Sequence, residues 1–209
     1  MAVSNRARSL RYPLVLASRS PRRRELLTSA GYAFEADPAD IDETPDPALS
    51  PAALAERLAI DKARVVATRR PETLVLGADT VVALFNPDGS FELLGKPDGP
   101  DDARRMLQRL SGTIHQVITG IALLARNEPA DVRHAVSGCR MKPLSAVEID
   151  AYVATGLWAG KAGGYGIQDD HGTTFRDDPF IQRIEGSFSN IVGLPMELVE
   201  SMLMRYHRE

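Results

Sequence analysis

The chain has one cysteine, Cys139, among its 209 residues. A single cysteine excludes an intrachain disulfide and fits a reducing compartment. Because Cys139 falls in a segment expected to form a strand, we interpret it as a buried, unreactive thiol rather than a nucleophile. Without cross-links the fold depends on its core, and 209 residues are enough for one domain with a sizeable core. We predict one domain over 1–209, with 1–11 as a flexible N-terminal segment.

Long apolar runs and an excess of one charge are also missing. Residues 1–11 are polar and basic and lack the apolar core of a signal peptide, and no segment is long enough to span a bilayer. The formal net charge of -3 gives no overall attraction to nucleic acid or to an anionic membrane. We therefore expect a cytoplasmic protein with neither partner, in which any basic site is local.

Several familiar motifs are absent as well. The glycine-rich stretch 160–168 is followed by no Lys-Ser or Lys-Thr pair, so it is not a Walker loop, and no strand leads directly into it. No His/Cys/Asp spacing around His115 supports a zinc site, and we interpret His115 as a hydrogen-bonded structural residue. The acidic stretch 169–178 could bind a cation, but a solvated loop is the better interpretation.

Helical and strand patterns alternate along the chain. Ser20 and Pro21 are a suitable N-cap and first residue for a helix that stops at Gly31. The pair Ser145 and Glu148 matches a capping box. The expected helices are 21–30, 51–68, 101–110, one that stops at 156 and one from about 195; the expected strands are 14–17, 74–84, 91–94, 117–125 and 133–141. This order predicts an α/β domain with a mixed sheet, including a hairpin at 86–89.

The centre of the apolar run 74–84 contains an aspartate, Asp79. An unpaired buried carboxylate costs several kcal/mol or shifts its pKa until it is neutral. We therefore expect Asp79 to have a partner: a metal ion, a lysine or a water molecule to be activated. The alternative is an aspartate at a strand end that only caps the next turn.

The helix expected from Pro21 has arginines in its first turn, at Arg22, Arg23 and Arg24. A helix N-terminus has unpaired N–H groups and partial positive charge, so cations are unfavourable there unless an anion binds. With the hydroxyl of Ser18, these groups could form a phosphate cradle. The alternative is a solvated arginine cluster.

Two lysines and one glutamine are the remaining candidate site residues. Lys62 lies on the apolar stripe of its helix, where it could extend to water or point into a polar cleft. Lys96 follows the hairpin and should lie near the strand of Asp79, unless it is an ordinary surface lysine. Gln168 ends the glycine-rich loop and could pair with a base edge. Several cations with few acids indicate a nucleotide or another polyphosphate ester, hydrolysed with a divalent metal, Mg²⁺ or Mn²⁺.

Six segments in order resemble the Maf family. They are Leu-Ala-Ser-x-Ser-Pro-Arg-Arg-x-Glu-Leu-Leu at 16–27, Gly-Ala-Asp-Thr-Val-Val at 77–82, Gly-Lys-Pro at 95–97, His-x-Val-x-Thr-Gly at 115–120, Lys-Ala-Gly-x-Tyr-x-Ile-Gln at 161–168 and Gly-Ser-x-Ser-Asn-x-Val-Gly-Leu-Pro at 186–195. The resemblance covers nearly the whole chain. It implies a mixed, elongated sheet flanked by helices, with two lobes and a central nucleotide cleft, and a possible homodimer.

The resemblance also implies a nucleoside triphosphate pyrophosphatase that forms a monophosphate and pyrophosphate. In this interpretation Asp79 is the proton acceptor, and Glu43 is a second acid near the metal. Ser18, Arg22, Arg23, Glu43, Lys62, Lys96 and Gln168 match positions that line the nucleotide cleft.

Base choice in the family is linked to positions matched by Arg22, Thr80 and Gln168. Thr80 resembles the branch that acts on dTTP and UTP, whereas the branch for 7-methyl-GTP tends to carry glutamine there. The chain departs from the family pattern after Gln168, where an acidic segment begins. We expect hydrolysis of dTTP and UTP, and of modified pyrimidine nucleotides as further candidate substrates. The alternatives are 7-methyl-GTP hydrolysis and a non-catalytic, nucleotide-binding regulator of cell division.

Overall fold

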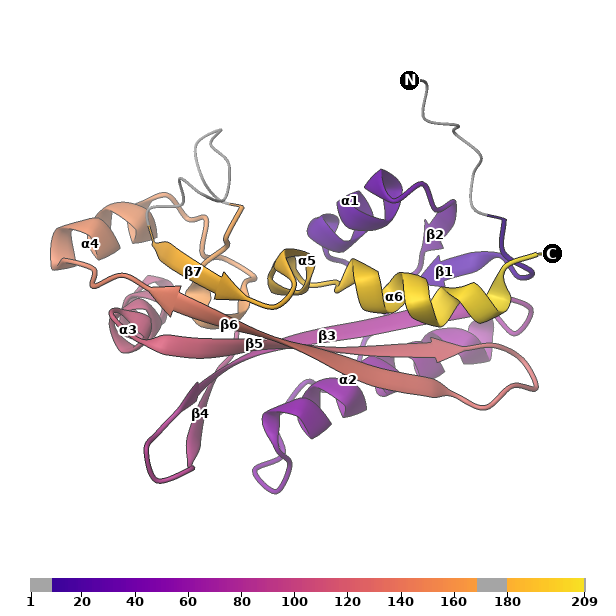
Figure 1. The fold of residues 1–209 in the computed structure, drawn as a ribbon, viewed down its shortest axis with the longest axis horizontal. Coiled ribbons are helices and arrows are strands. Elements are labelled where there is room, and N and C mark those ends of the chain that lie inside the picture. The colour runs from indigo at the N-terminus through magenta and orange to yellow at the C-terminus, as the bar shows by residue number, and fades with distance from the viewer. Residues whose placement is uncertain (1–8, 169–179, 209) are drawn as a thin grey trace. The chain divides into compact units, whose positions relative to one another are not determined.

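The computed structural model describes residues 9–168 and 180–208 and contains a seven-stranded mixed sheet (Figure 1). Its strand order is β2-β1-β3-β5-β6-β7, with β4 paired to β3. The strands are β1 (Leu14–Leu16), β2 (Phe34–Ala36), β3 (Leu74–Phe85), β4 (Phe91–Leu94), β5 (Ile114–Leu124), β6 (Asp131–Met141) and β7 (Ile181–Glu185). Since β1 is parallel to β2 and β3 while β4 and β7 are antiparallel to their neighbours, the predicted mixed α/β sheet is confirmed.

Helices flank the sheet. They are α1 (Pro21–Ser29), α2 (Pro51–Arg69), α3 (Pro100–Leu110), α4 (Ala146–Ala154), α5 (Phe188–Val192), α6 (Met196–Leu203) and the short 3₁₀ turns η1 (Ala162–Gly164) and η3 (Met204–Tyr206). The caps expected from the sequence form: the Ser20 side chain accepts from the N–H of Arg23, and Ser145 and Glu148 make a complete capping box. In the part of the chain described, no helix combines the length and apolar character needed to cross a bilayer.

The described chain forms two compact units. The first unit contains 9–79, 119–135 and 193–208, and the second unit contains 80–118, 136–168 and 180–192. The long strands β3, β5 and β6 contribute residues to both units. Along β3, Asp79 is therefore the last residue of the first unit, and Thr80 is the first residue of the second unit.

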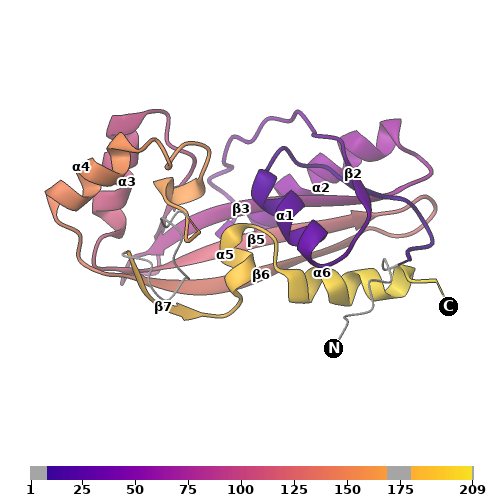
Figure 2. The ribbon, with the colours of Figure 1, turned by 90° about the horizontal axis from the view of Figure 1, so that it is seen from above.

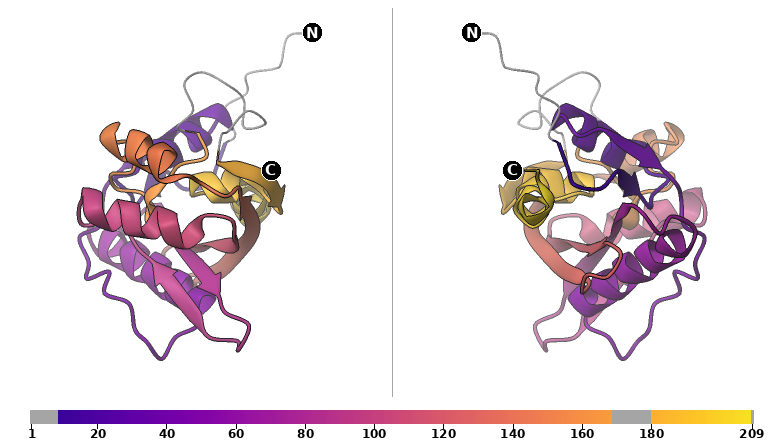
Figure 3. Two further views of the ribbon diagram at one scale, coloured as in Figure 1. Left: turned by 90° about the vertical axis from the view of Figure 1, so that its left-hand side faces the viewer. Right: turned by 90° about the vertical axis from the view of Figure 1, so that its right-hand side faces the viewer.

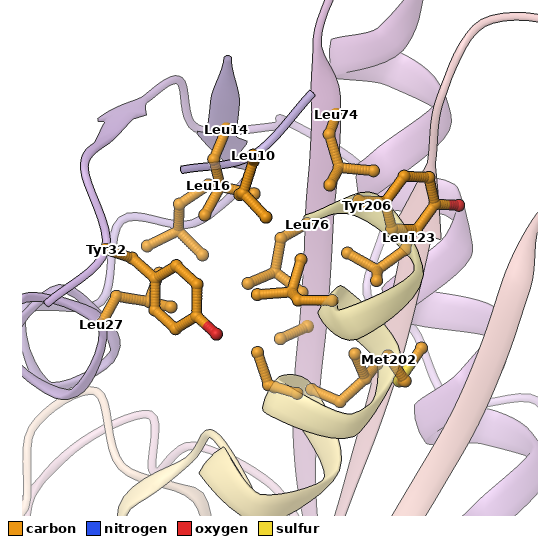
Figure 4. Close-up of a cluster of buried hydrophobic side chains, with 14 of the residues drawn as sticks. Leu10, Leu14, Leu16, Leu27, Tyr32, Leu74, Leu76, Leu123, Met202 and Tyr206 are labelled. Atoms are coloured by element: carbon orange, nitrogen blue, oxygen red, sulfur yellow. The ribbon is translucent and has the colours of Figure 1, made fainter. Parts of the chain in front are cut away.

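The first unit has helices on both faces of its strands: α1 and α6 cover one face and α2 the other (Figures 1 and 3). Alternation along β1 matches this layering. Leu14 and Leu16 join the cluster with Leu27 and Met202 (Figure 4), while Val15 packs in the other cluster with residues of α2. Successive strand side chains point to opposite faces, so both faces of β1 are buried.

Helix α2 approaches the sheet closely because glycines face it. A Cβ atom on Gly77 would overlap the carbonyl oxygen of Ala59, and one on Gly120 would overlap that of Ala55. Gly77 and Asp79 lie on the same face of β3, since they are two residues apart. The close approach therefore places the next turn of α2, which carries Lys62, beside Asp79.

The second unit contains the β3–β4 hairpin. Its helices α3 and α4 lie side by side (Figure 2). Helix α3 buries one apolar stripe: Ala103, Met106, Leu107 and Leu110. Cys139 is buried in β6, as expected for an unreactive thiol.

Candidate active site

A buried lysine holds two carboxylates at the edge of the first unit. Lys62 Nζ lies 2.5 Å from Asp79 Oδ1 and 2.6 Å from Glu43 Oε1. The side chains of Lys62 and Asp79 are only 8% and 9% exposed, whereas Glu43 is 40% exposed. Both alternative interpretations from the sequence are therefore wrong: Lys62 does not extend to water, and Asp79 lies inside β3 rather than capping a turn.

The arrangement is compatible with burial because the two buried charges, Lys62 and Asp79, compensate each other, while Glu43 keeps access to solvent. Removing one partner of a buried ion pair typically costs about 3–5 kcal/mol, since the other charge remains desolvated. Glu43 enters from the loop between β2 and α2 and offers its more exposed carboxylate towards solvent. The pair Asp79 and Glu43 thus combines a fixed, buried acid with an accessible one.

Arg23 is the second buried cation of this unit. Its Nη1 donates to the Ala78 carbonyl at 2.8 Å and to Ser18 Oγ at 3.1 Å, and its Nε donates to the Gly193 carbonyl at 2.7 Å. Burial lowers the pKa of Arg23 from its usual high value, while the negative charges of Asp79 and Glu43 oppose that shift. Arginine nevertheless stays protonated in proteins, so a positive charge is fixed beside the backbone of Ala78, the residue before Asp79.

The strand–loop–helix around Ser18 is shaped by hydroxyl groups. Ser18 Oγ accepts from the backbone N–H of Ser20 at 3.2 Å as well as from Arg23. Of the three arginines predicted to form the phosphate cradle, Arg23 is buried, Arg22 is half-buried and Arg24 is exposed. The three arginines of the predicted cradle therefore differ in exposure. Arg23 also donates hydrogen bonds to backbone carbonyls.

The first unit brings together five of the predicted site residues: Ser18, Arg23, Glu43, Lys62 and Asp79. Arg22, the residue before Arg23 in α1, belongs to the same unit. These positions come from several different helices, strands and loops, so only tertiary packing assembles them.

The other three predicted residues belong to the second unit. Thr80 is half-buried in β3, and Lys96 is exposed two residues after β4. Lys96 follows β4, which pairs through Leu94 with Val82 in the second-unit part of β3. Gln168 is exposed at the end of the glycine-rich loop, and the acidic stretch 169–178 lies outside the described residues.

Glu43 and Asp79 are the donors available for a divalent metal. No group of three or more His, Cys, Asp or Glu side chains suited to a metal occurs within the described ranges. Mg²⁺ is commonly bound by one or two carboxylates and completes its shell with substrate phosphates and water. Two carboxylates that converge on one ammonium satisfy that requirement, so the donor set fits Mg²⁺ or Mn²⁺.

His115 makes a buried side-chain contact that no sequence motif indicates. His115 Nε2 lies 2.6 Å from the hydroxyl of Tyr165, in the second unit. The expected structural role of His115 is confirmed for this nitrogen, but Tyr165 was not anticipated as its partner. The two residues are 50 positions apart, so no local pattern could connect them.

Comparison with known proteins decides the family. Residues 13–206 match the family model described as Maf-like protein. The chain belongs to the Maf family. This Maf protein is 48% identical over 185 residues to a protein of Salinibacter ruber named dTTP/UTP pyrophosphatase, covering 88% of this chain and 86% of that one. It is 46% identical to a Caulobacter vibrioides protein of the same name, covering 88% and 90% of the two chains.

Solved structures give a weaker likeness to this Maf protein. A crystal structure of a nucleoside-triphosphatase / dITP/XTP pyrophosphatase from Mycobacterium abscessus aligns over 93% of this chain and 95% of that one. The sequence identity is 17% and the TM-score is 0.44.

Proposed function

We propose that this Maf protein hydrolyses dTTP and UTP to the nucleoside monophosphate and pyrophosphate. The observation that carries the proposal is the buried Asp79 carboxylate, held by Lys62 beside the accessible carboxylate of Glu43. Relatives 42–48% identical over most of the chain, all named dTTP/UTP pyrophosphatase, supply the substrate class.

Asp79 is the proposed general base. Water attacks the α-phosphorus, the bond to the α–β bridging oxygen breaks, and the proton of the water passes to the carboxylate. Lys62 donates to Asp79 Oδ1 and so fixes the orientation of that carboxylate. General-base catalysis of this kind typically contributes about 10²–10⁴-fold to the rate.

Cations of the site are proposed to hold the triphosphate. Arg22, Arg23 and Lys96 supply the positive charge, and Ser18 a hydroxyl donor. Charge-assisted hydrogen bonds to phosphate are worth about 1.5–3 kcal/mol each. Thr80 and Gln168 are proposed to recognise the carbonyl and imide edge of thymine or uracil.

A divalent metal, Mg²⁺ or Mn²⁺, is proposed to bind Glu43 and Asp79. When bound it supplies positive charge that stabilises phosphate oxygens and lowers the pKa of coordinated water. Lys62 pairs with both of these carboxylates, so the lysine and the metal would interact with the same acids.

Substrate choice gives a direct test of the proposed function. We expect pyrophosphate release from dTTP and UTP, with kcat/KM well above that for 7-methyl-GTP, because a guanine is larger and presents a different donor pattern. A polar site that leaves hydrogen-bond groups unpaired can discriminate by up to ~10⁴. The measurement is a kinetic comparison of nucleoside triphosphates with Mg²⁺ or Mn²⁺, with separate assays for pyrophosphate and orthophosphate.

Two outcomes of that comparison would contradict the proposal at different levels. If 7-methyl-GTP is the best substrate, the proposed base preference is wrong, but the proposed pyrophosphatase activity is not contradicted. If every nucleotide releases only orthophosphate, or none is hydrolysed, the pyrophosphatase assignment is wrong.

Metal binding can be tested without turnover through Lys62→Met. The variant leaves Asp79 and Glu43 without their ammonium, so we expect a loss of about 3 kcal/mol or more in unfolding free energy without metal. Mn²⁺ should then raise Tm more in the variant than in the wild type, because it binds the uncompensated carboxylates of the folded state. Thermal unfolding with and without Mn²⁺ measures both effects.

Lys142→Met is the matched control, since Lys142 pairs with Glu148 at 2.9 Å in the second unit. That variant should show no added response to Mn²⁺. An equal Mn²⁺ shift in the wild type and both variants would refute metal binding at Glu43 and Asp79.

A further inference from the structure

The glycine-rich loop of the second unit is fastened to β5 by a buried side-chain contact. His115 Nε2 and Tyr165 Oη are 2.6 Å apart, and the two rings meet edge to face with centroids 5.5 Å apart at 86°. Both residues are buried, at 1% and 6% exposure. Neither residue has a role in the proposed chemistry.

The protonation of His115 depends on its surroundings. Burial lowers the pKa of His115 to about 4, so the ring is neutral at pH 7. Its Nδ1 is buried and has no hydrogen-bond partner among the residues that the structure describes. Through Nε2 the neutral ring shares one hydrogen bond with the hydroxyl of Tyr165, and either atom can be the donor, depending on the ring tautomer.

The loop needs this contact because its backbone is intrinsically permissive. Gly163 and Gly164 both have positive φ, at 73° and 71°. Gly163 donates its N–H to the Gly95 carbonyl at 2.9 Å, and a Cβ on Gly164 would press on Pro97 Cγ at 3.2 Å. The loop thus packs against the turn that contains Lys96, and Tyr165 is its first large side chain after the glycines.

The position of Gln168 depends on the same loop. Ile167 is buried at 3% exposure, and Gln168 comes next with an exposed side chain, three residues after Tyr165. Glycine loses more conformational freedom on folding than any other residue, so an anchor next to a glycine pair restricts the conformations open to the residues after it.

We propose that the His115–Tyr165 hydrogen bond is a positioning device that places Gln168 and so sets the enzyme's selectivity for the base. The inference rests on the proposed function, in which Gln168 recognises the pyrimidine. The two residues touch no substrate: they act through the loop and determine discrimination rather than the chemical step.

Tyr165→Phe tests the inference because it removes only the hydroxyl. The ratio of kcat/KM for dTTP over dCTP, which share sugar and triphosphate, should fall about 3–10-fold, the range expected from one lost hydrogen bond. The value for dCTP should change little. Tyr152→Phe, in α4 of the same unit, is the matched control and should keep the wild-type ratio.

A double-mutant cycle with Gln168→Ala separates positioning from a merely structural role. If Tyr165 acts through Gln168, the double variant should have the same selectivity as Gln168→Ala alone, so the effects are not additive. His115→Gln keeps a side chain that can donate or accept a hydrogen bond and should keep most of the selectivity, whereas His115→Leu should match Tyr165→Phe.

Unchanged selectivity in a folded Tyr165→Phe variant would overturn the inference, and so would additive effects in the cycle. Either result leaves the pyrophosphatase standing. Failure of the wild-type protein to release pyrophosphate from dTTP or UTP would instead refute the proposed function, and the inference with it.

Discussion

Asp79→Asn should abolish turnover of dTTP and UTP while leaving nucleotide binding largely intact. Asparagine keeps an oxygen that can accept from Lys62 Nζ, which lies 2.5 Å from Asp79 Oδ1, but it cannot take a proton from water. We expect kcat to fall by ~10²–10⁴-fold, the usual loss for a general base. Steady-state kinetics give kcat, and calorimetric titration with a non-hydrolysable dTTP analogue gives the affinity.

A neighbouring aspartate provides the control for this variant. Asp61 precedes Lys62 in α2 but pairs with Arg64 at 3.5 Å on the partly exposed side of the helix. Asp61→Asn should keep wild-type kcat. Near-normal turnover in a folded Asp79→Asn variant would remove Asp79 from the chemistry and leave it as a structural partner of Lys62.

Arg23→Ala should lower both stability and kcat/KM. The variant leaves the buried carbonyls of Gly193 and Ala78 without their guanidinium donor. Each buried hydrogen bond to a charged group is worth about 1.5–3 kcal/mol, so we expect unfolding free energy to fall by about 3 kcal/mol or more. Denaturant unfolding measures this loss.

The effect of Arg23→Ala on catalysis distinguishes its two roles. If Arg23 also contacts the triphosphate, kcat/KM should fall by at least about tenfold at a temperature where the variant is still folded, as one charge-assisted hydrogen bond implies. Arg24→Ala, at an exposed position of the same helix, should change neither quantity. If the variant is destabilised but keeps wild-type kcat/KM, Arg23 has only a structural role. If it keeps wild-type stability, the hydrogen bonds of Arg23 to the backbone do not stabilise the fold.

Local sequence chemistry predicted most of the helices and strands of this protein but not β2, β7 and α5. Ser20 with Pro21 marked the start of α1, and Ser145 with Glu148 marked the start of α4; both caps form as predicted. Helix α3 and the β3–β4 hairpin were also predicted. These features depend on residues within a few positions of each other, where capping, periodicity and turn preferences act.

The pairing of charges, by contrast, required the tertiary structure. The sequence indicated that Asp79 needs a partner but left a metal, a lysine and water open. Gly77 lets α2 approach β3, and this packing selects Lys62, 17 residues away, as the partner. Contacts over such separations depend on which faces pack together, and a local pattern does not contain that information.

The sequence by itself determined most of the helices and strands, the motifs of the Maf family and the need for a charge partner inside β3. Only the tertiary structure decided that Glu43 joins Asp79 on one ammonium, that Arg23 clamps two backbone carbonyls, and that His115 fastens the loop of Tyr165. The physical reason is desolvation. A charge or polar group becomes costly only once packing removes its water, and the partner that then satisfies it is whichever donor or acceptor the fold brings within reach.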